Sequence, residues 1–158
     1  MNAEMINPFL KSVLEVLSTM AMIEATPGKP FLKKERLATG DVTGMIGLVG
    51  EKAKGSLAIS FSENAIRHIS TQMLGEEPAA LDDGIADLVG EITNMVSGNA
   101  KRMLSEKGYK FEMAIPSTVI GREHQILHNT KGPVVVVPFE MDKGKFFIEV
   151  CFEDNALK

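Results

Sequence analysis

The sequence has few of the residues that form cross-links, and its positive charges are scattered. Among its 158 residues it has one cysteine, Cys151, one tyrosine and no tryptophan. A single cysteine excludes an intrachain disulfide and a metal site built from several cysteines. The net charge of -4, with lysine and arginine scattered among acids, gives no basic stripe for nucleic acid and no polybasic segment for a membrane surface.

Long hydrophobic runs are also missing. No apolar stretch approaches the roughly 18 residues of a membrane helix, and the N-terminus lacks the pattern of a signal peptide. We therefore expect a cytoplasmic protein with no nucleic-acid partner and no membrane insertion.

The chain does contain enough apolar sequence for one core. It is 44% hydrophobic and 158 residues long, which predicts a single domain over residues 1–158. Ten methionines and few aromatic residues favour an adaptable, aliphatic core over an aromatic ligand cage.

Three segments repeat apolar residues at helical spacing and have capping residues at their ends. A Pro-Gly-Lys-Pro run at 27–30 ends the first of them. The expected helices are Pro8 to Met22 with Asn7 as N-cap, Ser62 to Leu74 with Ser62 as N-cap, and Asp82 or Asp83 to Lys107 with Gly108 as the stop.

The remaining segments alternate apolar and polar residues as strands do. The expected strands are Phe31 to Leu37 with its lysines outward, Val42 to Val49 with Gly55 to Phe61 as a hairpin, Tyr109 to Ile115, Val119 to Ile120, and Val134 to Glu140 with Lys145 to Phe152 as a second hairpin. Gly44 and Gly47 indicate a bulge or the close approach of another backbone, for which a helix lying over the sheet is the expected candidate, and Pro138 predicts an edge or a bulge. The segment 121–131 is expected to be a loop.

Both halves of the sequence place a helix before strands that end in a hairpin. This order predicts a duplicated unit, with the helix at 62–74 linking the copies. The expected fold class is α+β: a two-layer domain with an antiparallel sheet, long helices packed on one face, and a pseudo-two-fold repeat of helix plus three strands.

The longest predicted helix has an unusual polar stripe. Asp87, Glu91 and Asn94 follow one another at spacings of four and three, which stack side chains on one helix face. With about 100° per residue and Asp87 at zero, Glu91 falls near 40°, Asn94 near 340° and Gly98 near 20°. The apolar residues of the helix cluster on another face, between roughly 100° and 200°.

Spacing alone does not assign a function to this stripe. A solvated helix face with an incidental hydrogen bond is the plainer interpretation, and Glu4 and Asn7 have the same spacing. Two glycines argue against it, because Gly90 and Gly98 each cost a helix roughly 1 kcal/mol relative to alanine. Asn99 falls on the core side and is expected to form a structural hydrogen bond.

The histidines offer a rival site. His124 and His128, with Glu123 beside them, have metal-ligand spacing only if the segment is helical, and the segment is predicted to be a loop. His68 is expected at the boundary of its helix. No nucleophile elbow and no phosphate-binding glycine loop is present. The sequence therefore shows no complete catalytic site formed by this chain alone.

The first predicted helix carries a partial copy of the stripe. Lys11, Glu15 and Ser18 have the same four-and-three spacing as Asp87, Glu91 and Asn94. Only the glutamate is kept, so one intact site per chain is expected.

These residues resemble the CheC, CheX and FliY family of bacterial chemotaxis phosphatases. The family motif, Asp-x-x-x-Glu-x-x-Asn, is matched at positions 87, 91 and 94, and the similarity extends through NMVSGNAK, GMIGLVGEKAKGSLAISFS and PSTVIGREH. A single intact motif resembles the CheX branch rather than the CheC branch, which usually keeps two.

The resemblance implies a phosphatase acting on the aspartyl phosphate of a CheY-type response regulator. Asn94 would orient the attacking water, and Glu91 would pair with a lysine of the regulator. Asp87 would be a rim contact or a helix-orienting group, and Gly98 would let the partner's loops come close. The regulator would bring Mg²⁺, so the chain would need no cofactor of its own.

The resemblance also implies a homodimer formed through sheet edges, for which Val134 to Val137 is an apolar candidate. Two other functions stay open at this point. The chain could be a binding module that docks a signalling partner without hydrolysis, or a dimeric scaffold whose polar stripe is incidental.

Overall fold

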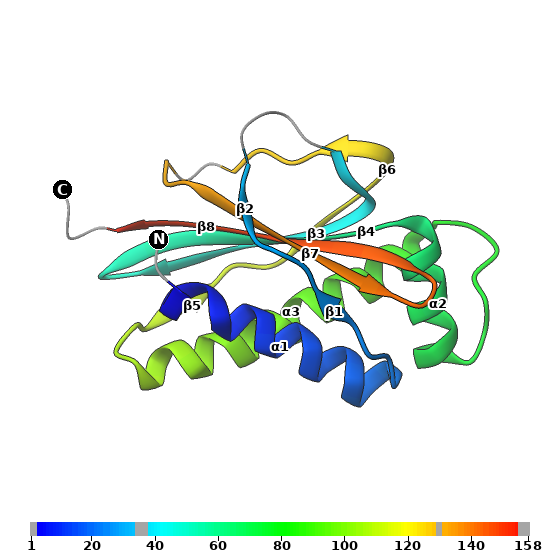
Figure 1. Cartoon of the computed structure of the whole chain (residues 1–158), viewed down its shortest axis with the longest axis horizontal. Helices are drawn as coiled ribbons and strands as arrows, with labels where there is room; N and C mark the ends of the chain where they lie inside the picture. The colour runs from blue at the N-terminus through cyan, green and yellow to red at the C-terminus, as the bar shows by residue number, and fades with distance from the viewer. Residues whose placement is uncertain (1–2, 34–37, 129–130, 155–158) are drawn as a thin grey trace.

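Helices and strands follow one another along the whole described chain (Figure 1). The computed structural model describes residues 3–33, 38–128 and 131–154. Within these ranges the helices are α1 Ala3–Ala21, α2 Glu63–Leu74 and α3 Asp83–Glu106. The strands are β1 Thr26–Pro27, β2 Phe31–Leu32, β3 Ala38–Gly50, β4 Ala53–Phe61, β5 Phe111–Met113, β6 Ser117–Gln125, β7 Val134–Met141 and β8 Gly144–Asp154.

All the strands join one antiparallel sheet. Its order is β1-β7-β8-β4-β3-β5, with β2 also paired to β7 and β6 also paired to β3. The long helices α1 and α3 lie side by side against one face of this sheet (Figure 1). The α+β fold class is confirmed.

The sheet also shows the internal repeat. The first half is α1 followed by β1 to β4, and the second is α3 followed by β5 to β8. In each half the third strand pairs with the first two strands of the other half, and the fourth strands, β4 and β8, pair with each other. The first half has one strand more than the three expected, because Thr26 and Pro27 form the short strand β1, which pairs with β7.

The core lies between the two long helices and the sheet. The ring centroid of Phe9 on α1 lies 5.9 Å from that of Phe152 on β8, and Val89 of α3 is fully buried. Gly44 on β3 lies directly under α3, because a Cβ at this position would overlap Thr93 Oγ1. The helix expected over Gly44 is confirmed, whereas a Cβ at Gly47 would meet nothing within 4 Å.

The predicted start of the first helix was wrong. α1 begins at Ala3, so Asn7 is not its N-cap and Pro8 lies inside the helix. Met5 is buried in the core, and this apolar contact stabilises one more turn before the proline. Pro8 is close enough to the helix start that only one early backbone hydrogen bond is missing.

The predicted strand at 31–37 was also partly wrong. β2 covers Phe31–Leu32, and residues 34–37 lie outside the described chain. Lys33 does not point outward: its Nζ donates to Glu149 Oε1 at 2.8 Å and to the Ile126 carbonyl at 2.9 Å. A buried carboxylate on β8 draws the ammonium group inward, because an unpaired buried charge is strongly unfavourable.

The segment predicted as a loop from Gly121 continues as strand β6 to Gln125. Its pairing with β3 has register shifts between Ala38 and Val42, and Glu123 has a positive φ of 52°. The Asp41 carboxylate accepts a hydrogen bond from the Glu123 backbone N–H at 3.1 Å. Irregular strand pairing of this kind leaves no clear alternation in the sequence.

The run Val134 to Val137 is not an exposed sheet edge. β7 lies between β8 and the short strands β1 and β2, and Val136 is fully buried. The local support that this run gave to a dimer interface is therefore removed. Pro138 keeps a continuous register with β8, so the expected bulge is absent there, and its carbonyl accepts from Gly28 N–H at 2.7 Å.

Candidate functional site

Helix α3 is fixed at both ends by the residues that the sequence predicts. The Asp82 side chain accepts hydrogen bonds from the N–H groups of Gly84, at 3.0 Å, and of Ile85, at 3.3 Å. At the other end Gly108 has a φ of +91°, which a residue with a side chain rarely adopts. Asp83 adds a negative charge to the first turn, where it interacts favourably with the helix dipole.

The polar stripe of α3 faces solvent. The side chains of Asp87, Glu91 and Asn94 are exposed, whereas Val89 and Ile92 on the core face are fully buried. Within residues 3–33, 38–128 and 131–154, no hydrogen bond or ion pair ties the three stripe side chains to the rest of the chain. The predicted two-sided helix is confirmed, and its polar groups are available to a partner.

A buried threonine holds the stripe against the sheet. Thr93 lies between Glu91 and Asn94 in sequence, is fully buried, and donates its hydroxyl to the Val89 carbonyl at 2.7 Å. It packs on β3 at Gly44, where any Cβ would overlap it. The sequence analysis missed Thr93; the available signal was Gly44, which predicted a close helix without identifying the residue on it.

Gly90 and Gly98 of α3 have different surroundings. A Cβ at Gly90 would lie 3.7 Å from Thr118 Cγ2 of β6, an ordinary contact, and a Cβ at Gly98 would meet nothing within 4 Å. The described fold therefore does not require glycine at Gly98, and the space above it is open. Asn99 is half-buried, and its hydrogen bond stays a prediction.

The partial copy of the stripe also lies on the surface. Lys11, Glu15 and Ser18 are exposed on α1, which runs beside α3 (Figure 1). The Ser18 hydroxyl donates to Glu24 Oε1 at 3.3 Å.

The histidines considered as metal ligands lie on the sheet face away from α1 and α3. His124 bonds to the Thr43 hydroxyl and to the Gly121 carbonyl. His128 bonds to Ser56 Oγ at 2.5 Å and to Glu149 Oε1 at 3.2 Å. Within the described ranges no group of three His, Cys, Asp or Glu side chains is arranged to hold a metal ion.

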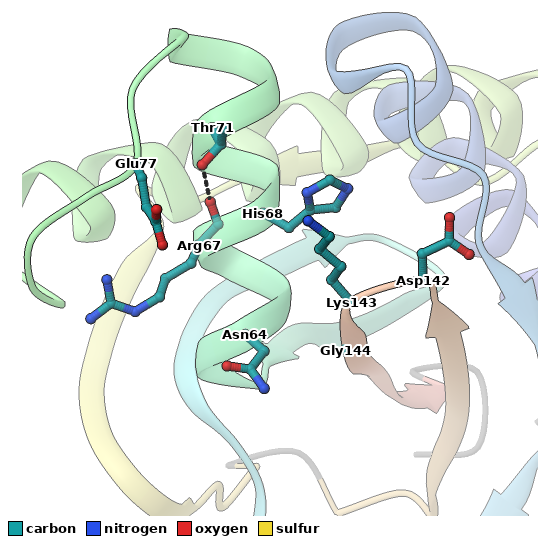
Figure 2. Close-up of a pocket in the computed structure, with 8 residues that line it drawn as sticks. All are labelled: Asn64, Arg67, His68, Thr71, Glu77, Asp142, Lys143 and Gly144. Atoms are coloured by element: carbon teal, nitrogen blue, oxygen red, sulfur yellow. Dashed lines mark hydrogen bonds between the residues drawn. The ribbon is translucent and has the colours of Figure 1, made fainter.

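A hollow of about 580 Å³ lies between α2 and the turn that joins β7 to β8 (Figure 2). Arg67, His68 and Lys143 line it together with Glu77 and Asp142, so both signs of charge are present. His68 is half-buried, as expected. The Thr71 hydroxyl in this hollow donates to the Arg67 carbonyl at 2.9 Å (Figure 2) and is not aligned with a base.

Cys151 offers no nucleophile. Its side chain is buried, and burial, followed by the nearby charge of Glu153, raises the pKa of the thiol, while hydrogen bonding with the Gly132 backbone lowers it. The protonated thiol is the unreactive form.

The stripe can therefore orient a water molecule and bind a partner, but none of its side chains is a nucleophile. An amide such as Asn94 can both donate and accept hydrogen bonds, so it can hold a water molecule. Carboxylates such as Glu91 and Asp87 can pair with a cation.

No helix in the described ranges is long and apolar enough to cross a membrane.

A family model described as chemotaxis phosphatase CheX matches residues 42–140, which include the whole stripe. A CheY-P phosphatase CheX of Thermotoga maritima is 32% identical over 127 residues, which cover 80% of this chain and 81% of the relative.

Two solved structures extend the similarity to the fold. The chemotaxis protein CheX of Vibrio vulnificus has a TM-score of 0.92 and 49% identity, over 96% of this chain and 100% of that one. A chain from the CheX-CheY-BeF₃-Mg²⁺ complex of Borrelia burgdorferi has a TM-score of 0.79 and 26% identity, over 94% of this chain and 97% of that one. Since the family model covers more than half of the sequence and the Thermotoga relative four fifths of it, this chain belongs to the CheX family of chemotaxis phosphatases.

Proposed function

We propose that this protein hydrolyses the aspartyl phosphate of a CheY-type response regulator with the stripe of α3. The observation that carries the proposal is an exposed amide, Asn94, beside an exposed carboxylate, Glu91, on a helix whose opposite face is buried in the core. The stripe has no nucleophile of its own. The name of the Thermotoga relative, CheY-P phosphatase, and the CheX-CheY complex of Borrelia support this choice of substrate.

Asn94 acts by holding the attacking water. Its amide hydrogen-bonds the water and places the oxygen in line with the phosphorus and the aspartate oxygen. The water oxygen forms the new bond to phosphorus as the bond to the aspartate oxygen breaks, so a free carboxylate and inorganic phosphate are released. An amide does not take a proton at neutral pH, so positioning is its whole contribution.

Glu91 fixes how the regulator docks. Its exposed carboxylate stands one helical turn from Asn94 and forms a charge-assisted hydrogen bond with a lysine of the regulator's active site. Asp87 lies one further turn away and contacts the rim of the regulator. Gly98, with open space above its Cα, lets the backbone of the regulator approach α3.

The Mg²⁺ that neutralises charge on the phosphoryl group is bound by the regulator in this proposal. The donor set of the described chain fits this division. Among the described residues, no three His, Cys, Asp or Glu side chains at the stripe are grouped so that they could hold a metal ion. The stripe therefore complements a metal-bearing partner rather than holding the ion itself.

Replacing Asn94 tests the proposal directly. Asn94→Ala removes the group that holds the water, so we expect kcat for phosphate release to fall on the order of 100-fold, with little change in regulator binding. Phosphate release from a phosphorylated CheY-type regulator measures this, and binding is followed with the beryllofluoride-activated regulator.

The matched control is Asn64→Ala, because Asn64 is also an exposed asparagine on a helix but lies on α2. It should hydrolyse at the wild-type rate. Equal rates for wild type and Asn94→Ala would contradict the mechanism. Binding without hydrolysis by the wild type would instead support a non-catalytic binding module.

The homodimer and the cytoplasmic location remain predictions. With Val134 to Val137 paired on both sides, by β8 and by β2 with Lys33, a dimer through sheet edges would use the terminal strands. On one side these are β1 and β2, where Phe31 and Leu32 are exposed.

A further inference from the structure

A shallow groove opens beside the first turns of α3. Its volume is about 310 Å³, and its floor is formed by small and apolar residues of the loop before α3 and of β6, namely Ala79, Ala80, Leu81, Ile120 and Gly121. The rim carries Glu63, which pairs with Arg67 at 3.0 Å and with Arg122 at 3.6 Å. The single carboxylate balances one of the two arginines, so the rim keeps one net positive charge around a mainly apolar floor.

The groove is continuous with the polar stripe. Leu81 directly precedes Asp82, the N-cap of α3. On β6, Thr118 lies against α3 at Gly90, and Ile120, two residues further, points to the same face because strand side chains alternate. From Asp83 to Glu91 the helix rises about 12 Å, and Asp87 stands between the groove and Glu91.

The stripe alone is too small to hold a folded partner. A specific protein interface buries about 800 Å² on each partner, which corresponds to a patch roughly 30 Å across, whereas the stripe consists of three side chains and one glycine. Binding energy in such interfaces concentrates in apolar side chains that fill pockets. Ile120 is 39% exposed, and it lies within that distance of Glu91.

We propose that this groove receives an apolar side chain of the response regulator's receiver domain and sets the affinity of docking, while the stripe performs the hydrolysis. The inference rests on the proposed function for the identity of the partner. Its occupant is an aliphatic or aromatic group, because the floor of the groove is formed by small and apolar residues. Ile120 is then a specificity-determining residue that does not touch the reacting atoms.

Two substitutions test the groove. Ile120→Ser removes the apolar floor, and Ala80→Arg places a bulky charge on an exposed loop residue without disturbing the core. We expect each to weaken binding of the beryllofluoride-activated receiver domain with Mg²⁺ about tenfold, and to raise KM for phosphate release similarly. The value of kcat should stay within about twofold.

The matched control is Val49→Ser, because Val49 is also an exposed β-branched residue, 65% exposed, on a strand. It lies seven residues along β3 from Val42, the partner of Ile120, or about 23 Å away. It should bind as wild type does. Thermal unfolding of each variant, followed by circular dichroism, shows which of them keep the native fold.

Wild-type affinity in both groove variants would overturn the inference, as would a fall in kcat with unchanged KM. A change of oligomeric state in Ile120→Ser with unchanged receiver binding would show that a second copy of this chain occupies the groove, and would overturn it too. If the wild type bound the receiver without hydrolysing it, the proposed function would fail, and the binding measurements would still decide the role of the groove.

Discussion

Gly98 shows how a residue can be unfavourable for folding and still fit a site. Glycine destabilises a helix interior by about 1 kcal/mol relative to alanine, and nothing within 4 Å would obstruct a Cβ at this position. The described fold therefore gives no reason for glycine here. The proposed function supplies one, because Gly98 lies on the stripe with Glu91 and Asn94, and a partner's backbone can approach closely where no side chain projects.

Substitution at Gly98 should separate stability from docking. Gly98→Leu should raise the free energy of unfolding by up to about 1 kcal/mol, because leucine is a good helix former. It should lower the affinity for the activated receiver domain by about tenfold, because the side chain fills the space used for docking. Urea denaturation and receiver binding measure the two effects.

Gly98→Ala is the graded control for this prediction. It should gain similar stability and lose less affinity, because a methyl group projects less than an isobutyl group. Unchanged receiver binding by Gly98→Leu would show that the space above Gly98 is not used.

Among the helices and strands, the sequence predicted the features that depend on neighbouring residues. Ser62 and Asp82 cap their helices, and both hairpins form as expected, because caps and turns depend on neighbouring residues. The start of α1 at Ala3 depends on Met5 reaching the core, and the extension of β6 depends on irregular pairing with β3. Neither interaction can be read from a local pattern.

The stripe was predictable for a similar reason. Helical spacing placed Asp87, Glu91 and Asn94 on one face, and the exposure of all three is now confirmed. The contact that holds the helix in place, Thr93 on Gly44, joins residues 49 positions apart in sequence, and spacing within one helix could not reveal it. The groove likewise brings β6 to the loop before α3.

The contact between Gly44 and Thr93 gives a prediction about the position of α3. Gly44→Ala places a Cβ in overlap with Thr93 Oγ1 and 3.0 Å from Val89 Cγ1. Such overpacking should lower the free energy of unfolding by about 1–3 kcal/mol and reduce kcat, because the stripe moves with the helix. Thermal denaturation and phosphate release measure the two effects.

The control is Gly47→Ala on the same strand, where a Cβ would meet nothing within 4 Å; we expect a change of less than about 0.5 kcal/mol. The double variant Gly44→Ala, Thr93→Ala removes the overlapping hydroxyl and should recover part of the loss. Equal stability of Gly44→Ala and Gly47→Ala would show that α3 adapts without cost.

For the whole molecule, the order of elements predicted the repeat but not how its halves are joined. Each half pairs its third strand with the first strands of the other half, an exchange that no single segment encodes. On the sheet face away from α1 and α3, a buried ion pair also joins the halves. Lys33 of the first half lies 2.8 Å from Glu149 of the second, with the side chains 7% and 0% exposed.

Removing one member of this pair should destabilise the whole fold. Lys33→Met takes the Lys33 ammonium away from the buried Glu149 carboxylate, and breaking a buried pair in this way costs about 3–5 kcal/mol. The double variant Lys33→Met, Glu149→Gln removes the charge while keeping an acceptor for His128, which bonds to Glu149 Oε1 at 3.2 Å, so it should recover much of the loss. The free energy of unfolding in urea measures both.

Lys54→Met is the matched control, because Lys54 lies 3.7 Å from Glu153 and its side chain is 42% exposed. Loss of this solvent-screened pair should change the free energy of unfolding by less than about 1 kcal/mol. The difference between the two lysines isolates burial as the cause, since both pair with a glutamate of β8. If Lys33→Met were as stable as Lys54→Met, the ion pair would not hold the halves together, and the strand exchange alone would account for their cohesion.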